Sequence, residues 1–206
     1  MRPLKTKLDR FIAYAEDGEV EKLRAMLDKD PALVNKKWEY GWTALHRASM
    51  FGHTDVVRLL IERGAAVHAK DAKRRTPLES AAACKTGLPA MCLIVQAGAA
   101  IDNRSTYWET PIMTAVIFGN AENFAYLLGL GARLDLRNRL GLDCFGMIAY
   151  QLEGASPDDD PKSDRYRMIA EALEVIKVSN GRQAISGVAN GRHTRAAVSE
   201  HGEDER

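Results

Sequence analysis

The chain has 206 residues, of which 46% are hydrophobic and 28% are charged. This composition is close to that of an average soluble globular protein and disfavours both wholesale disorder and a membrane-embedded body. Lysine and arginine total 29 against 28 aspartate and glutamate residues, so the net charge provides no global attraction toward nucleic acid or anionic lipid.

Neither a membrane span nor a signal-peptide core is expected from the apolar stretches. Charged residues interrupt the apolar residues 11–13 on both sides, and no run approaches the roughly 18 apolar residues that a span needs. The three cysteines, Cys84, Cys92 and Cys144, have no CxxC spacing, which argues against a disulfide framework and a structural zinc site. We therefore expect a protein of the reducing cytoplasm.

The amino-terminal segment 4–37 is predicted to form two amphipathic helices that cap whatever follows. The first apolar face consists of Leu8, Phe11, Ile12 and Ala15, and the second of Val20, Leu23, Met26 and Leu27. Lysines and arginines between these positions give the pair a polar outer side, as the end of a stack requires.

Three internal repeats follow, at 38–70, 71–104 and 105–137. Thr43, Thr76 and Thr110 lie 33 and 34 residues apart, and glycine–alanine pairs close each repeat with the same period. Threonine followed by proline, as at 76 and 110, favours the start of a helix. One helix is too continuously apolar to have one wet side, since it contains Val56, Val57, Leu59, Leu60 and Ile61. It is therefore expected to be sandwiched between neighbouring repeats.

A degenerate unit is predicted at 138–177, with an acidic loop at 154–163 that replaces the usual tight turn. Its first helix would present Phe145, Ile148, Ala149 and Leu152, and its second Tyr166, Ile169, Leu173 and Ile176. Beyond it, residues 178–206 are rich in Gly, Ser, Asn and Arg without periodicity and are predicted to be disordered.

The segment TALHRASMFGH, residues 43–53, resembles the ankyrin repeat. The resemblance implies an all-α ankyrin-repeat solenoid over residues 1–177, in which helix-turn-helix units with β-hairpin fingers stack between two caps. The chain departs from the family pattern at the histidine (Glu79 and Met113), at the proline (Ala44 and Cys144) and at the turn glycine (Arg74 and Trp108). These departures concern helix capping and turns.

We predict no enzyme, cofactor or metal site. His46 and His53 occupy positions where the ankyrin pattern places histidines that tie turns together. No HExxH, GxSxG, P-loop or GxGxxG motif is present. The acidic run 158–160 lacks the alternating ligand spacing and central glycine of an EF-hand loop, so a solvated loop is the simpler interpretation.

The resemblance implies a non-catalytic module that binds another protein through its fingertips and the inner face of the first helices, the concave side. Trp, Tyr and Arg are enriched at interface hot spots, and the fingertips contain all three tryptophans of the chain. The alternative is that these tryptophans pack on neighbouring hairpins with arginines stacked on them. The predicted partner-binding residues are Tyr40, Trp42, Phe51, Lys73, Arg75, Arg104, Tyr107, Trp108, Phe118, Arg137 and Arg139.

The excess of basic residues along the fingers favours a partner with an acidic or phosphorylated segment. Two other functions stay open. The chain could be a regulatory or inhibitory subunit that covers an enzyme's active site, with the 154–163 loop inserted. It could also bind single-stranded nucleic acid, since aromatic and arginine residues alternate there, although the near-neutral total charge makes this option the weaker one.

Overall fold

The computed structural model describes residues 6–153, and the side chains of residues 6–150. The predicted second helix of the carboxy-terminal unit, the acidic loop 154–163 and the tail 178–206 lie outside the described residues. The helices are α1 (Lys7–Glu16), α2 (Val20–Lys29), the 3₁₀ helices η1 (Pro31–Asn35) and η2 (Glu39–Gly41), α3 (Ala44–Phe51), α4 (Thr54–Glu62), α5 (Pro77–Ala83), α6 (Leu88–Gln96), α7 (Pro111–Ile117), α8 (Ala121–Gly129) and α9 (Cys144–Glu153).

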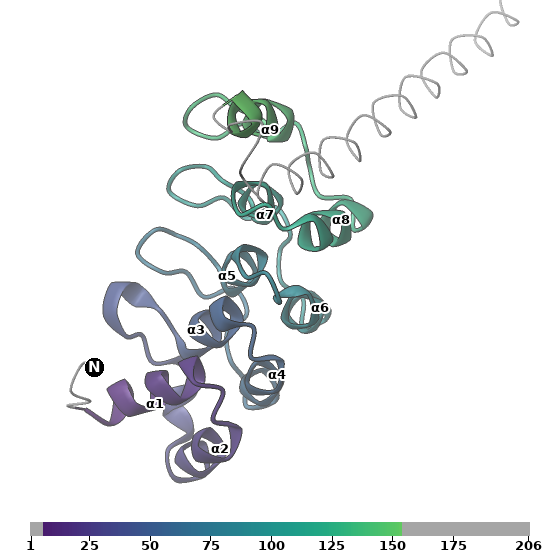
Figure 1. Cartoon of the computed structure of the whole chain (residues 1–206). Helices are drawn as coiled ribbons and strands as arrows, with labels where there is room; N and C mark the ends of the chain where they lie inside the picture. The colour runs from purple at the N-terminus through teal and green to yellow at the C-terminus, as the bar shows by residue number, and fades with distance from the viewer. Residues whose placement is uncertain (1–5, 154–206) are drawn as a thin grey trace, which may run out of the picture. The chain divides into compact units, whose positions relative to one another are not determined.

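The helices of the described segment form two rows (Figure 1). The inner row consists of α1, α3, α5, α7 and α9, each in contact with the next, and the outer row of α2, α4, α6 and α8 is connected in the same way. Loops project from the inner row on the side away from the outer row. We call these loops fingers and number them in chain order: 38–42, 71–75, 105–109 and 138–142.

Threonine side chains set where the inner helices begin. The hydroxyl groups of Thr6, Thr43 and Thr76 accept a hydrogen bond from the backbone N–H three residues later, and the side chain at that later position bonds back to the threonine N–H. This reciprocal arrangement satisfies two N–H groups that a helix start leaves unpaired. Thr110 begins α7 without such a bond, and its buried hydroxyl has no partner among the described residues.

The outer helices are buried between repeats, as predicted from their apolar sequence. In α4 the side chains of Val56, Val57, Leu59 and Leu60 are at most 2% exposed. Contacts of α4 with α2, α3 and α6 account for this burial. Gly52 ends α3 in the left-handed conformation, with φ +74°, which glycine adopts without the steric cost of a side chain. Over the described segment, no helix combines the length and the hydropathy needed to cross a membrane.

Candidate protein-binding face

Each finger is a tight turn closed by backbone hydrogen bonds, and none of the residues 6–153 is in a β-strand. The first and last residues of every finger are joined by one N–H···O=C bond of 2.7–3.0 Å. The fourth finger residue, at positions 41, 74, 108 and 141, has a positive φ of 60–76°. Two of these four residues are glycine, but Arg74 and Trp108 adopt the same conformation against the steric preference of side chains other than glycine.

Three fingers are also held from within by the side chain of their first residue. The Asp71 carboxylate accepts hydrogen bonds from the backbone N–H groups of Lys73 and Arg75. Ser105 and Asn138 make the equivalent pair of bonds in the third and fourth fingers. Sequence analysis did not assign these residues a role, although a short polar side chain at a constant distance from the helix start was visible there.

The fingers are linked to one another along the face. The N–H of Ala72 donates to the Tyr40 carbonyl at 2.7 Å, that of Thr106 to the Lys73 carbonyl at 2.7 Å, and that of Arg139 to the Tyr107 carbonyl at 2.9 Å. Because successive fingers share these bonds, the four tips form one ordered surface. We call this surface, together with the exposed side of the inner helices, the finger face.

The exposure of a finger side chain depends on the position of its residue within the finger. The third residue of each finger, at 40, 73, 107 and 140, is exposed, whereas the fifth, at 42, 75, 109 and 142, is half-buried. Tyr40 is 72% and Tyr107 46% exposed, and Trp108 at the turn position is 51% exposed. The predicted contact residues Tyr40, Tyr107 and Trp108 are therefore accessible.

Trp42 has a packed environment instead. Its indole N–H donates to the Asp71 carboxylate at 3.0 Å, and the Arg47 guanidinium lies 4.4 Å from its ring centroid. Arg47 also lies 5.1 Å from the Phe51 ring and pairs with Glu16. This geometry matches the alternative interpretation, a tryptophan that packs on its neighbours, and it reveals Arg47 as an organising residue that sequence analysis did not single out.

The third finger has its own pair of cation–aromatic contacts. Lys73 lies 5.6 Å from the centroid of Tyr107, and the Arg104 guanidinium lies 5.1 Å from that of Trp108. Such contacts hold the long basic side chains near the surface of the rings. From the inner helices, Phe51 and Phe118 are 47% and 54% exposed and extend the aromatic surface beyond the fingers.

The remaining predicted basic residues differ in how they are held. Arg75 is half-buried and forms an ion pair with Asp71 at 2.7 Å. Arg137 donates to the Gly141 carbonyl, and Arg104 to the Arg137 carbonyl. Arg139 is exposed. Together these residues place cations on the second and fourth fingers and directly before the third and fourth fingers.

The carboxyl groups of the second and third fingers, Asp71 and Glu109, are partly shielded. Burial alone would raise the pKa of Asp71, but hydrogen bonds from Arg75 and Trp42 outweigh it, so this pKa lies below its usual range. Burial raises the pKa of Glu109, against the attraction of Arg75 and Lys73. Among the described residues, none of Lys73, Arg74, Arg104, Arg137 and Arg139 forms an ion pair with a carboxylate.

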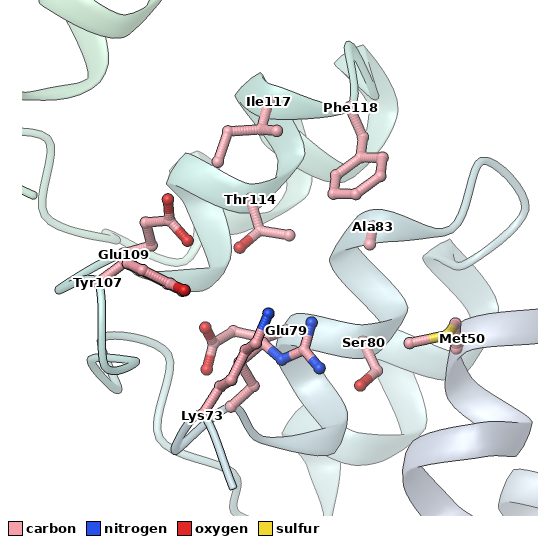
Figure 2. Close-up of a pocket in the computed structure, with 11 residues that line it drawn as sticks. Met50, Lys73, Glu79, Ser80, Ala83, Tyr107, Glu109, Thr114, Ile117 and Phe118 are labelled. Atoms are coloured by element: carbon pink, nitrogen blue, oxygen red, sulfur yellow. The ribbon is translucent and has the colours of Figure 1, made fainter. Parts of the chain in front are cut away.

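A groove of about 450 Å³ lies where the second and third fingers meet the inner helices. Figure 2 shows Ile117 of α7, Phe118 directly after α7 and Ala83 of α5 on one side, and Tyr107 and Glu109 of the third finger on the other. Further lining side chains are Met50, Lys73, Arg75, Glu79, Ser80 and Thr114. The groove combines apolar walls with a few polar groups, which is typical of a binding site.

Two buried titratable groups near this face have structural partners. His46 bonds to Thr43 and to the Arg75 carbonyl, and burial lowers its pKa to about 4. Glu79 is 2% exposed, and burial raises its pKa to about 8, against hydrogen bonds from Thr76 and Asn103. Within residues 6–150 no group of three or more metal-binding side chains is brought together.

Comparison with known proteins agrees with this arrangement. A family model described as ankyrin repeats matches residues 11–105 with three copies. The chain is 32% identical, over 170 residues or 82% of its length, to a homologue of transient receptor potential cation channel subfamily A member 1 from Caenorhabditis elegans. The human ankyrin repeat domain-containing protein 63 is 33% identical over 156 residues, or 70% of the chain. The human NAD-capped RNA hydrolase NUDT12 is 36% identical over 81 residues, or 39% of the chain.

The chain spans 14%, 40% and 18% of the lengths of these three relatives, respectively. What they share with it is the repeat region. Ankyrin repeats generally serve as protein-interaction modules and are generally non-catalytic. The matched repeats, the two rows of helices and the linked fingers together show that this chain is an ankyrin-repeat protein.

Proposed function

We propose that the finger face binds another protein and prefers an acidic segment of it. Five cations on the fingers or directly before them carry this proposal, and we call them the finger cations. They have no carboxylate partner in the described part of the chain: Lys73, Arg74, Arg104, Arg137 and Arg139. Unpaired cations on a preorganised surface attract carboxylates and strengthen charge-assisted hydrogen bonds to them.

The aromatic residues of the same face supply contact area. Tyr40, Tyr107 and Trp108 are accessible at the tips, and Phe51 and Phe118 along the inner helices. Trp42 and Arg75 are half-buried, so in this proposal they hold the tips in place more than they contact the partner. The cytoplasmic location also stays a prediction, for which the three free cysteines provide support.

Strained turns support a functional use of the tips. Arg74 and Trp108 adopt the left-handed conformation at φ +60° and +61°, although glycine occupies this position in the other two fingers. A side chain other than glycine costs about 1 kcal/mol there. Contacts of the Arg74 and Trp108 side chains with a partner would explain why large side chains occupy these positions.

The proposal is tested by affinity capture from a nuclease-treated lysate of the source cells with the full chain. The triple variant Lys73→Glu, Arg104→Glu, Arg139→Glu reverses three finger cations, and circular dichroism verifies its fold. We expect a specific protein that wild type retains and this variant loses, with retention that also falls as the salt concentration rises.

A matched variant controls for charge alone. Lys29, Arg58 and Lys85 are exposed and lie away from the fingers, and their simultaneous replacement by glutamate should leave capture unchanged. Equal retention by both triple variants would contradict the proposal. If nuclease treatment itself abolishes capture, the nucleic-acid alternative replaces it; if the captured protein is an enzyme that the chain inhibits, the regulatory-subunit alternative is supported.

A further inference from the structure

The groove between the second and third fingers exists because one repeat has a small side chain where its neighbours have large ones. The equivalent position of each inner helix, seven residues after Thr43, Thr76, Thr110 or Asp143, holds Met50, Ala83, Ile117 or Tyr150, respectively. Met50, Ala83 and Ile117 all line the groove, and Ala83 leaves the space that Met50 and Ile117 fill in the adjacent repeats. The hollow is therefore a local feature of this repeat.

The apolar end of the groove is open to solvent. Phe118 is 54% exposed at its rim, and Ile117 and Ala83 are half-buried beside it. Figure 2 shows Phe118 and Ala83 facing the same space. An exposed aromatic ring next to a hollow of this volume is suited to cover one large apolar side chain of a partner.

The polar end of the groove favours groups that accept hydrogen bonds. Lys73 and Arg75 both line it, and Lys73 lies over the Tyr107 ring. The Oε2 atom of Glu79 accepts bonds from Thr76 and Asn103, whereas its buried Oε1 atom has no partner among the described residues. Burial raises the pKa of Glu79 and of Glu109, the two lining carboxyl groups, so both oppose the cations less than exposed carboxylates would. Arg75 is paired with Asp71, which makes Lys73 the lining cation available to a partner.

We propose that this groove is the anchor site for a partner segment in which a large apolar residue adjoins an acidic residue. The apolar side chain enters between Ala83 and Phe118, and the carboxylate contacts Lys73. A basic segment is disfavoured because its cation would meet Lys73 at close range. This inference rests on the proposed function and adds the anchor point and the composition of the bound segment.

The probe for the experiment is a random 12-residue peptide library displayed on phage, selected against the full 206-residue chain. We expect the enriched peptides to share a large apolar residue next to Asp or Glu. Enrichment of basic peptides, or no enrichment after repeated rounds, would overturn the proposal.

Binding of a selected synthetic peptide is then measured by fluorescence anisotropy with groove variants. Ala83→Phe fills the hollow and Lys73→Glu reverses the charge, and each should weaken binding at least about tenfold. The matched controls are Ala125→Phe on α8 and Lys85→Glu after α5, both at exposed positions outside the groove, and these should keep the affinity of wild type within about twofold.

The outcomes separate this inference from the proposed function. If the natural partner and the peptide bind Ala83→Phe as tightly as wild type while the finger-charge triple variant loses the partner, the groove is not the anchor site and the finger face still binds. If the finger-charge variant keeps the partner, the proposed function fails independently of the peptide result.

Discussion

The buried carboxyl group of Glu79 should make the stability of the fold depend on pH. Its pKa is about 8 in the folded chain against 4.5 for an exposed glutamate. A carboxyl whose pKa rises on folding stabilises the folded chain fully below the unfolded pKa, and this contribution is lost as the pH rises toward the folded pKa. The lowered pKa of His46 has the opposite effect on stability, which rises with pH between about pH 4 and pH 6.5.

Between pH 6.5 and 8 the Glu79 effect is therefore separated from that of His46. One pH unit corresponds to about 1.4 kcal/mol, so wild type should lose about 2 kcal/mol of unfolding free energy over this range. Glu79→Gln keeps a hydrogen-bonding side chain without a titratable proton and should remove this loss. The assay is urea unfolding followed by circular dichroism at pH 6.5 and 8, with Glu62→Gln on the exposed side of α4 as control. An equal pH dependence in wild type and Glu79→Gln would refute the reasoning.

Three further predictions concern stability and can be checked by thermal or urea unfolding. Leu60→Asp should unfold the stack of repeats, at a cost of about 4 kcal/mol or more, because it buries an unpaired charge at a fully buried site. Arg58→Asp at an exposed position of the same helix should change stability little. A native-like melt of Leu60→Asp would contradict the burial of α4 between repeats. Arg74→Gly should raise the unfolding free energy by about 0.5–1 kcal/mol by relieving the left-handed strain, and a loss of stability would show that the Arg74 side chain itself stabilises the finger. Asp71→Ala should cost about 3 kcal/mol because it removes the side chain that accepts hydrogen bonds from the second finger and from the Trp42 indole. Asp135→Ala removes an exposed ion pair with Arg133 and should change stability far less; similar losses for the two would argue against the role of Asp71.

The repeat architecture was predictable because its determinants are local and periodic. A threonine cap, a short apolar helix and a glycine turn recur every 33 or 34 residues, and each of these features specifies backbone conformation directly. The departure from the family histidine at Met113 coincides with a difference in helix capping. Met113 has no side-chain group that bonds back to the Thr110 N–H, and the Thr110 hydroxyl lacks a partner in the described structure.

The different environments of Trp42 and Trp108 were harder to predict from the sequence. Trp42 and Trp108 differ by one position within the finger, and this difference places Trp42 against Asp71 and Arg47 while Trp108 lies at the exposed turn. Composition alone cannot separate these two environments. The structure separates them by finger position, since the fifth finger residue is half-buried in all four fingers.

The groove could not be predicted because it depends on side chains from three repeats. Ala83 reads as an ordinary small residue in an apolar helix, and its effect appears only when Met50 and Ile117 lie on either side of it. The role of Arg47 is similar, since its partners Glu16, Trp42 and Phe51 come from two successive units. Contacts between units are set by stacking, which a single repeat does not encode.

Site-specific photo-crosslinking tests the binding role of the finger face most directly. A photo-reactive phenylalanine derivative is introduced in place of Tyr107 at a finger tip or, as control, in place of Ala125, which is exposed on α8 of the outer row. The two proteins are irradiated in lysate, and adducts are identified by mass spectrometry. The account predicts a specific protein adduct from position 107 and none from position 125. Adducts formed equally at both positions, or only at 125, would contradict it.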